Sequence, residues 1–338
     1  MNNQVIRWLN MCCISVFIMI LIGGATRLTQ SGLSMVDWKP ILGVFPPLNN
    51  VQWEKSFNEY KKYPEYQKIN QFKQMDLYKY KSIYYWEYIH RLFGRILGLM
   101  LVIPPFIYFR KGYIDKKIFK HSLFCMFLVI LQGVLGWFMV KSGLVDNPHV
   151  SHYRLTAHLF LAFSLIGYLY WLKLKLTIND ISNKSLNPVS CHIQGIFFFY
   201  IIQVIFGAFI AGTKAGLLWN TFPLMEGRLI PEGLLILEPI YSNFFNNLKM
   251  FQFCHRVIGF SLLIYVSWFF YISRNEFYSK YSHFLFMAFL MQFYIGIMTL
   301  LLRVPVLLGV IHQGIAVLIL LLILHIKFLI SNTQSINR

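Results

Sequence analysis

Residues 306–329 read VLLGVIHQGIAVLILLLILHIKFL, and Lys327 is the only charged residue in this stretch. A helix needs about 20 apolar residues to cross the hydrocarbon core of a bilayer, so this stretch predicts a membrane span. Seven further runs of the same character lie at roughly 8–24, 84–108, 122–140, 154–172, 193–212, 250–272 and 284–302. The sequence therefore predicts eight transmembrane helices.

The composition of the whole chain agrees with this interpretation. The 338 residues are 57% hydrophobic and 13% charged, and the mean hydropathy is +0.54. Soluble domains carry about 25% charged residues, so a soluble enzyme and a disordered chain are excluded. A net charge of +18 in so apolar a chain indicates cytoplasmic loops facing a lipid bilayer, and no nucleic acid is expected as a partner. The predicted class is an all-α polytopic membrane protein.

The distribution of basic residues predicts the orientation in the membrane. Lysines and arginines gather after the second, fourth and sixth runs, as in Arg110-Lys111, and few follow the third and seventh. The positive-inside rule then places both termini in the cytoplasm. The first run has no small-residue cleavage site and is expected to be retained. Without an Arg- and Ser-rich presequence, we expect a bacterial inner (cytoplasmic) membrane, with residues 25–83 as an extracytoplasmic cap that contains short amphipathic helices.

The two halves of the chain resemble each other. His90-Arg91 and His255-Arg256 each begin the pattern His-Arg-x-x-Gly at the same place in the second and sixth runs. Because each half has four spans in the same orientation, the sequence predicts two pseudo-symmetric four-helix bundles. The predicted division is residues 1–180, which include the cap, and residues 181–338.

Four of the ten histidines lie inside predicted spans at matched depth. They are His90, His158, His255 and His312, each four to six residues past the start of a run that enters from the outer side. At 1.5 Å per residue this is about 6–10 Å below the outer boundary. An ionisable group at such a depth is a functional hypothesis by default.

Two imidazoles that face each other from neighbouring helices suit the iron of a haem. The residue four positions after each histidine is small: Gly94, Ala162, Gly259 or Ala316. Such residues would leave room for the macrocycle, although small residues also serve close helix packing in lipid. We pair His90 with His158, and His255 with His312. Zinc is the competing metal, but it requires three or four converging ligands.

The two halves differ beside these histidines. Glu87 precedes His90 by three residues, whereas Gln252 occupies the same place before His255. A carboxyl group at one site and an amide at the other suggest chemistry at the first and electron transfer at the second. The alternative for Glu87 is an ion pair at the membrane boundary, with Arg91 or with a lysine of the outer loop.

The stretch from Gly23 to Met35, GGATRLTQSGLSM, resembles the haem A synthase family. The resemblance continues through Trp38-Lys39-Pro40, and the segments around Glu87, His158 and His255 strengthen it. It extends over nearly the whole chain and is greatest to the proteobacterial and mitochondrial branch of the family.

The resemblance implies an enzyme that oxidises the C8 methyl group of haem O to a formyl group, giving haem A for cytochrome oxidase. It implies haem B as a cofactor on His255 and His312, substrate haem O facing His90 and His158, and Glu87 as the catalytic carboxylate. Partners compatible with it are a haem O synthase, an electron-transfer partner, cytochrome oxidase assembly factors and a second copy in a homo-oligomer. The histidine pattern alone also fits a bis-histidine haem B electron carrier.

Overall fold

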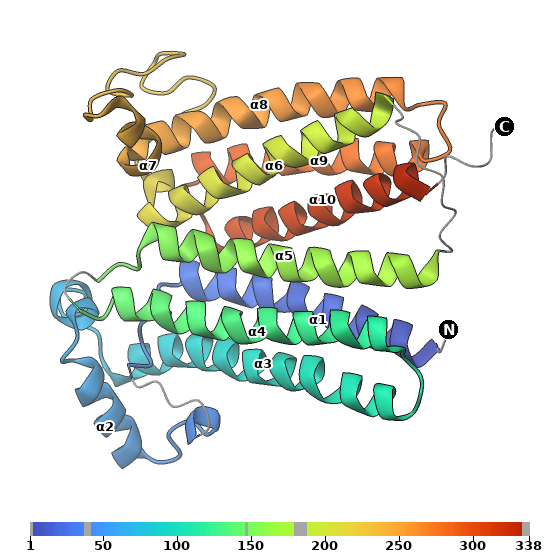
Figure 1. The fold of residues 1–338 in the computed structure, drawn as a ribbon. Helices are drawn as coiled ribbons and strands as arrows, with labels where there is room; N and C mark the ends of the chain where they lie inside the picture. Colours follow the sequence, from blue (N-terminus) through green and yellow to red (C-terminus); the bar gives the residue numbers. More distant parts are fainter. Residues whose placement is uncertain (1–2, 37–41, 146–147, 179–187, 333–338) are drawn as a thin grey trace. The chain divides into compact units, whose positions relative to one another are not determined.

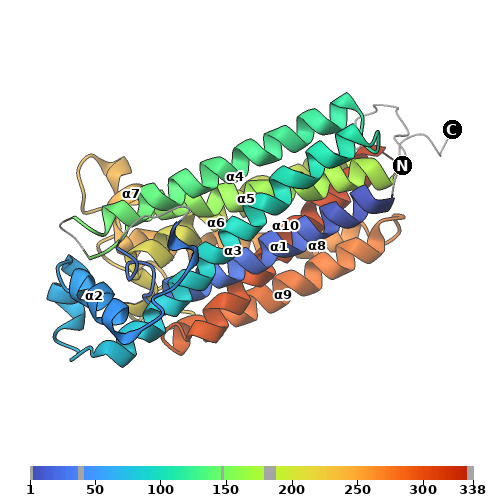
Figure 2. The same ribbon diagram turned by 90° about the horizontal axis from the view of Figure 1, so that it is seen from below.

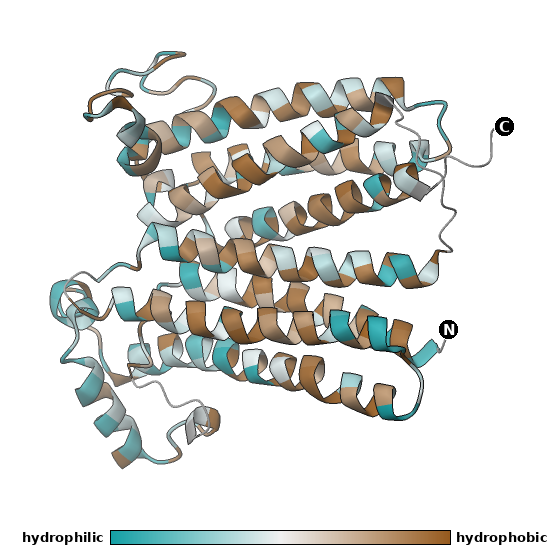
Figure 3. Ribbon diagram, in the orientation of Figure 1, coloured by the Kyte–Doolittle hydropathy of each residue, from teal (hydrophilic) through white to brown (hydrophobic). Residues whose placement is uncertain are grey.

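The structure, a computed structural model, describes residues 3–36, 42–145, 148–178 and 188–332. Within these residues every regular secondary-structure element is a helix, and the only strand-like pairing is an isolated bridge between Met225 and Arg228. Eight helices are long and apolar enough to span a membrane, and their apolar colouring is visible in Figure 3. They are α1 (Asn3–Leu28), α3 (Leu77–Arg110), α4 (Lys116–Ser142), α5 (His152–Thr177), α6 (Pro188–Thr213), α8 (Leu248–Ile272), α9 (Ser279–Leu301) and α10 (Val306–Asn332). The predicted all-α multi-pass class is confirmed.

Most of the helices extend beyond the predicted apolar runs. The largest difference is in α3, which begins at Leu77 rather than near residue 84. Asp76 caps its first turn by accepting the N–H of Lys79 at 2.8 Å, and Asp115 caps α4 through the N–H of Ile118 at 2.7 Å. Hydropathy detects only the apolar part of a helix, whereas capped polar turns continue the same backbone hydrogen bonding.

The chain divides into two compact units. Residues 14–162 form one of them, and the described residues up to 13 together with those from 163 onward form the other. In the second unit α6, α8, α9 and α10 make a closed bundle, because α6 contacts α8 and α10, and α9 also contacts both. These four helices run side by side in Figures 1 and 2. The division expected near residue 180 rests on the sequence repeat and stays a prediction.

In the unit of residues 14–162, α3 packs along α4 (Figure 2). The part of α1 in this unit contacts α3, since Met19 and Gly23 lie against Gly94 and His90. The beginning of α5 contacts α4 through Gly136 and His158. These contacts bring His90 and His158 against the helices that precede them.

The predicted short amphipathic helix in residues 25–83 is confirmed as α2 (Asn50–Tyr60), which packs on the first turns of α3 (Figure 1). Its buried face is formed by Trp53, Phe57 and Tyr60, and these rings pack against Tyr80 and Tyr84 of α3. The early start of α3 thus provides the surface that orders this segment. Trp38-Lys39-Pro40 lie outside the described residues.

The buried Tyr60 is also held by polar contacts. Its hydroxyl donates to Glu65 at 2.9 Å and accepts from Asn70 at 2.6 Å. Burial and the nearby Glu65 carboxylate raise the pKa of Tyr60 well above its usual value. These bonds tie the residues that follow α2 to its buried face.

Candidate haem sites

Each of the four histidines packs against a glycine on the preceding spanning helix. The position that a Cβ of that glycine would take lies 3.1 Å from Cε1 of His158 at Gly136, and 3.1 Å from Cε1 of His255 at Gly207. At Gly296 the distance to Cε1 of His312 is 2.9 Å. Cβ atoms seldom come so close to another side chain, so glycine is the residue that lets these rings approach the neighbouring backbone without a shift.

Three of these histidines also contact a glutamine one helical turn before the glycine. Nε2 of Gln132 lies 3.2 Å from Nε2 of His158, and the corresponding distances are 3.3 Å for Gln203–His255 and for Gln292–His312. The spacing Gln-x-x-x-Gly places both residues on the same face of the helix. The imidazole is therefore held between a backbone surface and an amide.

The polar atoms of His255 define which ring nitrogen is available. Its Nδ1 donates to the backbone carbonyl of Gln203 at 3.2 Å. A histidine that donates through Nδ1 carries its lone pair on Nε2, which is the usual arrangement of a metal-ligating imidazole. Iron would bind this Nε2 in place of the side-chain amide of Gln203, which lies 3.3 Å from it.

His90 has a different environment. The α1 residue one turn before Gly23 is Met19, so the glutamine of the other three sites is replaced by a thioether. The atoms of His90 nearest to the Cβ position of Gly23 are Nε2 at 3.2 Å and Cδ2 at 3.7 Å, whereas Cε1 and Nδ1 are nearest at the other three sites. Exchanging these atoms corresponds to a half-turn of the ring about its Cβ–Cγ bond.

The structure brings the histidines together as the predicted pairs. His90 and His158 lie close enough for their charges to interact, and the same holds for His255 and His312. Among the described residues no three His, Cys, Asp or Glu side chains form a metal-binding cluster. That each pair holds the iron of one haem stays a prediction.

Several buried polar atoms beside these histidines have no hydrogen-bond partner. Within the described residues these include Nδ1 of His158 and His312, and Oε1 of Gln132, Gln203 and Gln292. Buried polar atoms are normally paired, so a group of them at matching sites indicates a place where a polar or metal-containing ligand belongs. The donor set of paired imidazoles suits iron.

The small residues four positions after the histidines have a neighbour that the sequence did not reveal. The Cβ position of Gly94 lies 3.3 Å from Cε of Met19, and that of Gly259 lies 3.2 Å from Nε2 of Gln203. These glycines therefore make room for the α1 or α6 side chain beside the imidazole. The expectation that they make room for the macrocycle stays a prediction.

Glu87 is buried, and both of its carboxylate oxygens accept hydrogen bonds. Its carboxylate accepts the hydroxyl of Ser34 at 2.7 Å and the backbone N–H of Met35 at 2.8 Å. Arg91 donates to it at 2.5 Å and also to the carbonyl of Met35 at 2.8 Å. The ion pair considered from the sequence is present, and it fastens residues 34–35 to α3 within one turn of His90.

The second unit has a related but weaker arrangement at Gln252. The side-chain amide of Gln252 donates to the carbonyl of Trp219 at 3.3 Å and accepts from Arg256 at 3.3 Å. Arg256 donates to the same carbonyl at 2.9 Å. The corresponding arginine therefore fastens a loop in each unit, bonded to the carboxylate of Glu87 in the first and to the amide of Gln252 in the second.

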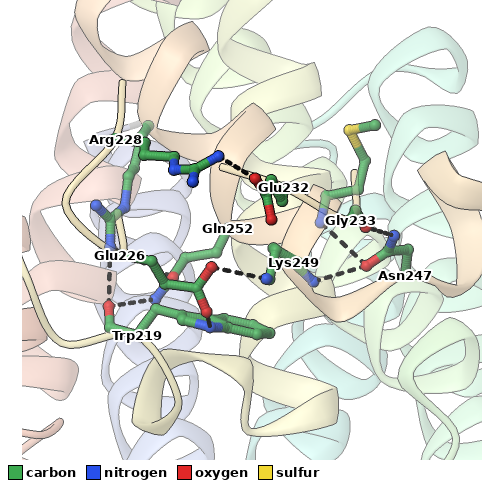
Figure 4. Close-up of polar contacts among 10 residues, drawn as sticks. Trp219, Glu226, Arg228, Glu232, Gly233, Asn247, Lys249 and Gln252 are labelled. Atoms are coloured by element: carbon green, nitrogen blue, oxygen red, sulfur yellow. Dashed lines mark hydrogen bonds and ion pairs between the residues drawn. The ribbon is translucent and has the colours of Figure 1, made fainter. Parts of the chain in front are cut away.

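The loop beside Gln252 is built from polar contacts (Figure 4). Glu226 accepts from Lys249 at 2.8 Å and from the indole of Trp219 at 2.9 Å. The hydrogen bond from Lys249 lowers the pKa of Glu226 below its usual value. Asn247 caps α8 and donates to the carbonyl of Gly233 at 2.8 Å, so the loop is anchored at the start of the helix that carries His255.

The sequence reasoning missed the three glutamines. A detectable signal existed, because Gln-x-x-x-Gly occurs at 132–136, 203–207 and 292–296, near the end of the span that precedes each histidine. Glutamine inside an apolar span is uncommon enough to be noticed, but its partner lies on another helix.

The sequence profile of the COX15-CtaA family, described as cytochrome oxidase assembly protein, matches residues 6–324. The chain belongs to this family. It is 43% identical over 323 residues to the Heme A synthase of Nitrosospira multiformis, in an alignment that covers 92% of this chain and 89% of the relative. The Heme A synthases of Ehrlichia canis and Flavobacterium johnsoniae are 41% and 39% identical over 316 and 326 residues. These alignments cover 90% and 94% of this chain, and 87% and 95% of the relatives.

The predicted resemblance to the haem A synthase family is therefore confirmed. The matched range of this COX15-CtaA protein includes Glu87 and all four paired histidines. The individual roles of these residues stay predictions.

Proposed function

We propose that this protein is a haem A synthase that oxidises the C8 methyl group of haem O to a formyl group. The observation that carries the proposal is the position of four buried histidines, each against a glycine of the preceding spanning helix. Membership of the COX15-CtaA family and about 40% identity to curated Heme A synthases support the reaction.

In this proposal His255 and His312 hold haem B in the second unit. Both rings contact a glutamine and a glycine, and the Nδ1 bond of His255 leaves Nε2 for iron. When bound, haem B supplies one-electron redox chemistry. The protein residues hold its ligands in one orientation and surround them with apolar helices.

The first unit takes substrate haem O at His90 and His158. Glu87 is the candidate catalytic residue, which orients or deprotonates a water or hydroxyl at the methyl carbon being oxidised. Arg91, Ser34 and Met35 support this role because their hydrogen bonds fix the carboxylate in one position. The second unit has Gln252 at this position, which cannot accept a proton in the same way.

We further propose that the protein lies in a bacterial inner membrane with both termini in the cytoplasm. The eight spans and the basic loops between them support this orientation. Haem O would arrive from a haem O synthase, and an electron-transfer partner would connect haem B to the respiratory chain. Cytochrome oxidase assembly factors and self-association are further candidate interactions.

The test is to express the full chain with a haem O synthase in cells that lack haem A, and to identify the extracted haems by chromatography and mass. We expect haem A only when the chain is present. The variant Glu87→Ala should retain haem but accumulate haem O, and Gln252→Ala is the matched control that should still form haem A. Haem B with unconverted haem O in the unmodified protein would instead support a bis-histidine electron carrier.

A further inference from the structure

The segment that leads into α8 has polar side chains inside and apolar side chains outside. Asn243, the first residue of α7 (Asn243–Asn246), is buried, and so is Asn247, which follows this short helix at the start of α8 (Figure 1). The large apolar side chains of the same segment are between 41% and 70% exposed: Leu235, Ile236, Ile240, Tyr241, Phe244 and Phe245. In a segment surrounded by water, buried amides beneath a group of exposed apolar side chains are the reverse of the usual arrangement.

The two buried asparagines satisfy the backbone of this segment from within. The side chain of Asn243 accepts two backbone N–H groups, from Ile236 and Leu237, and donates to two carbonyl groups. The side chain of Asn247 donates to two more carbonyl groups, at 2.8 and 3.1 Å. Internal hydrogen bonds of this kind are needed where the surroundings are apolar, because lipid offers the backbone no partners in place of water.

The helix α2 of the first unit shows the opposite arrangement. Its rings of Trp53, Phe57 and Tyr60 are buried, whereas polar side chains such as Lys55 and Asn58 are exposed. This is the usual distribution for a segment in water. The two connections therefore have different surroundings, water for α2 and an apolar medium for residues 233–247.

Lipid is the apolar medium next to residues 233–247. The segment continues directly into α8, which is long and apolar enough to span a membrane and on which Phe260 and Ile264 are 40% and 70% exposed. Glu238 is the only charged residue among residues 233–247, so the surface offers little to a charged protein partner. Tyrosine, here Tyr241, is a residue typical of the boundary between lipid and water.

We propose that residues 233–247 form a lipid-docking surface in the head-group region of the leaflet in which α8 begins. The side chains of Ile236 and Tyr241 reach the acyl chains, as those of interfacial segments do over a depth of about 5–10 Å. Because Asn247 also caps α8, lipid contact at this surface fixes the depth at which α8 enters the bilayer, and with it the depth of His255. The proposal depends on the membrane spans and is independent of haem chemistry.

A polarity-sensitive fluorophore, NBD, on single cysteines tests the proposal in the full chain, reconstituted at low density in phosphatidylcholine vesicles. The five native cysteines are replaced by alanine, and the labelled variants are Ile236→Cys, Ile264→Cys and Asn58→Cys. Ile264 has the same exposure as Ile236, 70%, but lies inside a spanning helix. Asn58 is exposed on α2, which follows the first span as residues 233–247 follow the fifth, so both connections lie on one side of the membrane.

Iodide in the buffer measures contact with water, and spin-labelled lipids measure contact with lipid. We expect iodide to quench Asn58→Cys but not Ile236→Cys. Spin labels near the head group should quench Ile236→Cys more than labels at the end of the acyl chain, and the order should be reversed for Ile264→Cys. Equal quenching of Ile236→Cys and Asn58→Cys by iodide would overturn the proposal. Protection of Ile236→Cys from both quenchers would also overturn it and would assign the surface to a second copy of the chain.

A second measurement keeps the native cysteines, in case the cysteine-free chain does not fold. The photoreactive variant Tyr241→benzoylphenylalanine should form phospholipid adducts on illumination, detected by mass, as should Ile264→benzoylphenylalanine inside the span. Adducts at Ile264 but none at Tyr241, or a cross-link from Tyr241 to a second chain in place of a lipid adduct, would contradict lipid docking.

Discussion

The variant Glu87→Ala tests the most heavily bonded residue near His90. It removes a carboxylate that accepts three hydrogen bonds, from Ser34, Met35 and Arg91. In this ion pair the side chain of Glu87 is 3% exposed and that of Arg91 is 16% exposed. The substitution therefore leaves a mostly buried guanidinium with its bond to the Met35 carbonyl but without a counter-charge.

The expected loss of stability follows from these contacts. Removing one partner of a buried ion pair costs about 3–5 kcal/mol, and the remaining exposure of Arg91 favours the lower end, about 3 kcal/mol. The matched variant Gln252→Ala removes only neutral-amide contacts at 3.3 Å, for which we expect about 1 kcal/mol. Glu87→Gln should fall between the two, because its amide oxygen can still accept the N–H of Met35.

The assay is thermal unfolding of the purified protein in detergent micelles, followed by helix content, together with the ratio of haem A to haem O in the cells. At about 2 °C per kcal/mol for a chain of this size, Glu87→Ala should unfold about 6 °C earlier than the unmodified protein. Equal shifts for Glu87→Ala and Gln252→Ala would refute the buried ion-pair argument. If Glu87→Gln forms haem A in proportion to its folded fraction, the carboxylate serves only to hold residues 34–35.

The remaining predictions concern packing and pH. Gly296→Ala should displace the imidazole packed on it and lower haem content severalfold, whereas Gly133→Ala, whose Cβ position has no atom within 4 Å, should retain haem; equal retention would contradict the packing argument. The raised pKa of Tyr60 means that its stabilising effect is full below pH about 10 and decreases above it, so proteolysis of residues 50–70 should accelerate in alkali unless Tyr60 is replaced by Phe. The lowered pKa of Glu226 means that its bond to the indole of Trp219 persists below the usual carboxylate pKa and breaks on further acidification, which a change in tryptophan fluorescence, absent in Glu226→Gln, would report.

The amino-acid sequence determined the membrane fold and the candidate ligands. Eight apolar runs were sufficient for eight helices, because in lipid a spanning segment must satisfy its backbone hydrogen bonds within itself. The paired histidines were recognisable for a related reason, since an ionisable residue inside an apolar run is energetically unfavourable and stands out. Both signals are local, and each can be read from one segment at a time.

The early start of α3 was not predictable from hydropathy. Residues 77–83 are polar and aromatic, and they form helix because Asp76 caps them and Trp53, Phe57 and Tyr60 cover Tyr80 and Tyr84. The same limit applies to Glu87. Its ion pair with Arg91 follows from helical spacing, but its bonds to residues 34–35 join segments more than 50 residues apart.

The sequence by itself thus determined which segments can span a membrane and which residues are the candidate iron ligands. Only the tertiary structure decided how each imidazole is held, because the glycine and glutamine that contact it belong to another helix. Gln132 contacts His158 only because α4 packs against α5, and Met19 lies beside the His90 site only because α1 packs against α3. Hydropathy is a property of each segment by itself, whereas the orientation of a histidine side chain depends on packing between helices.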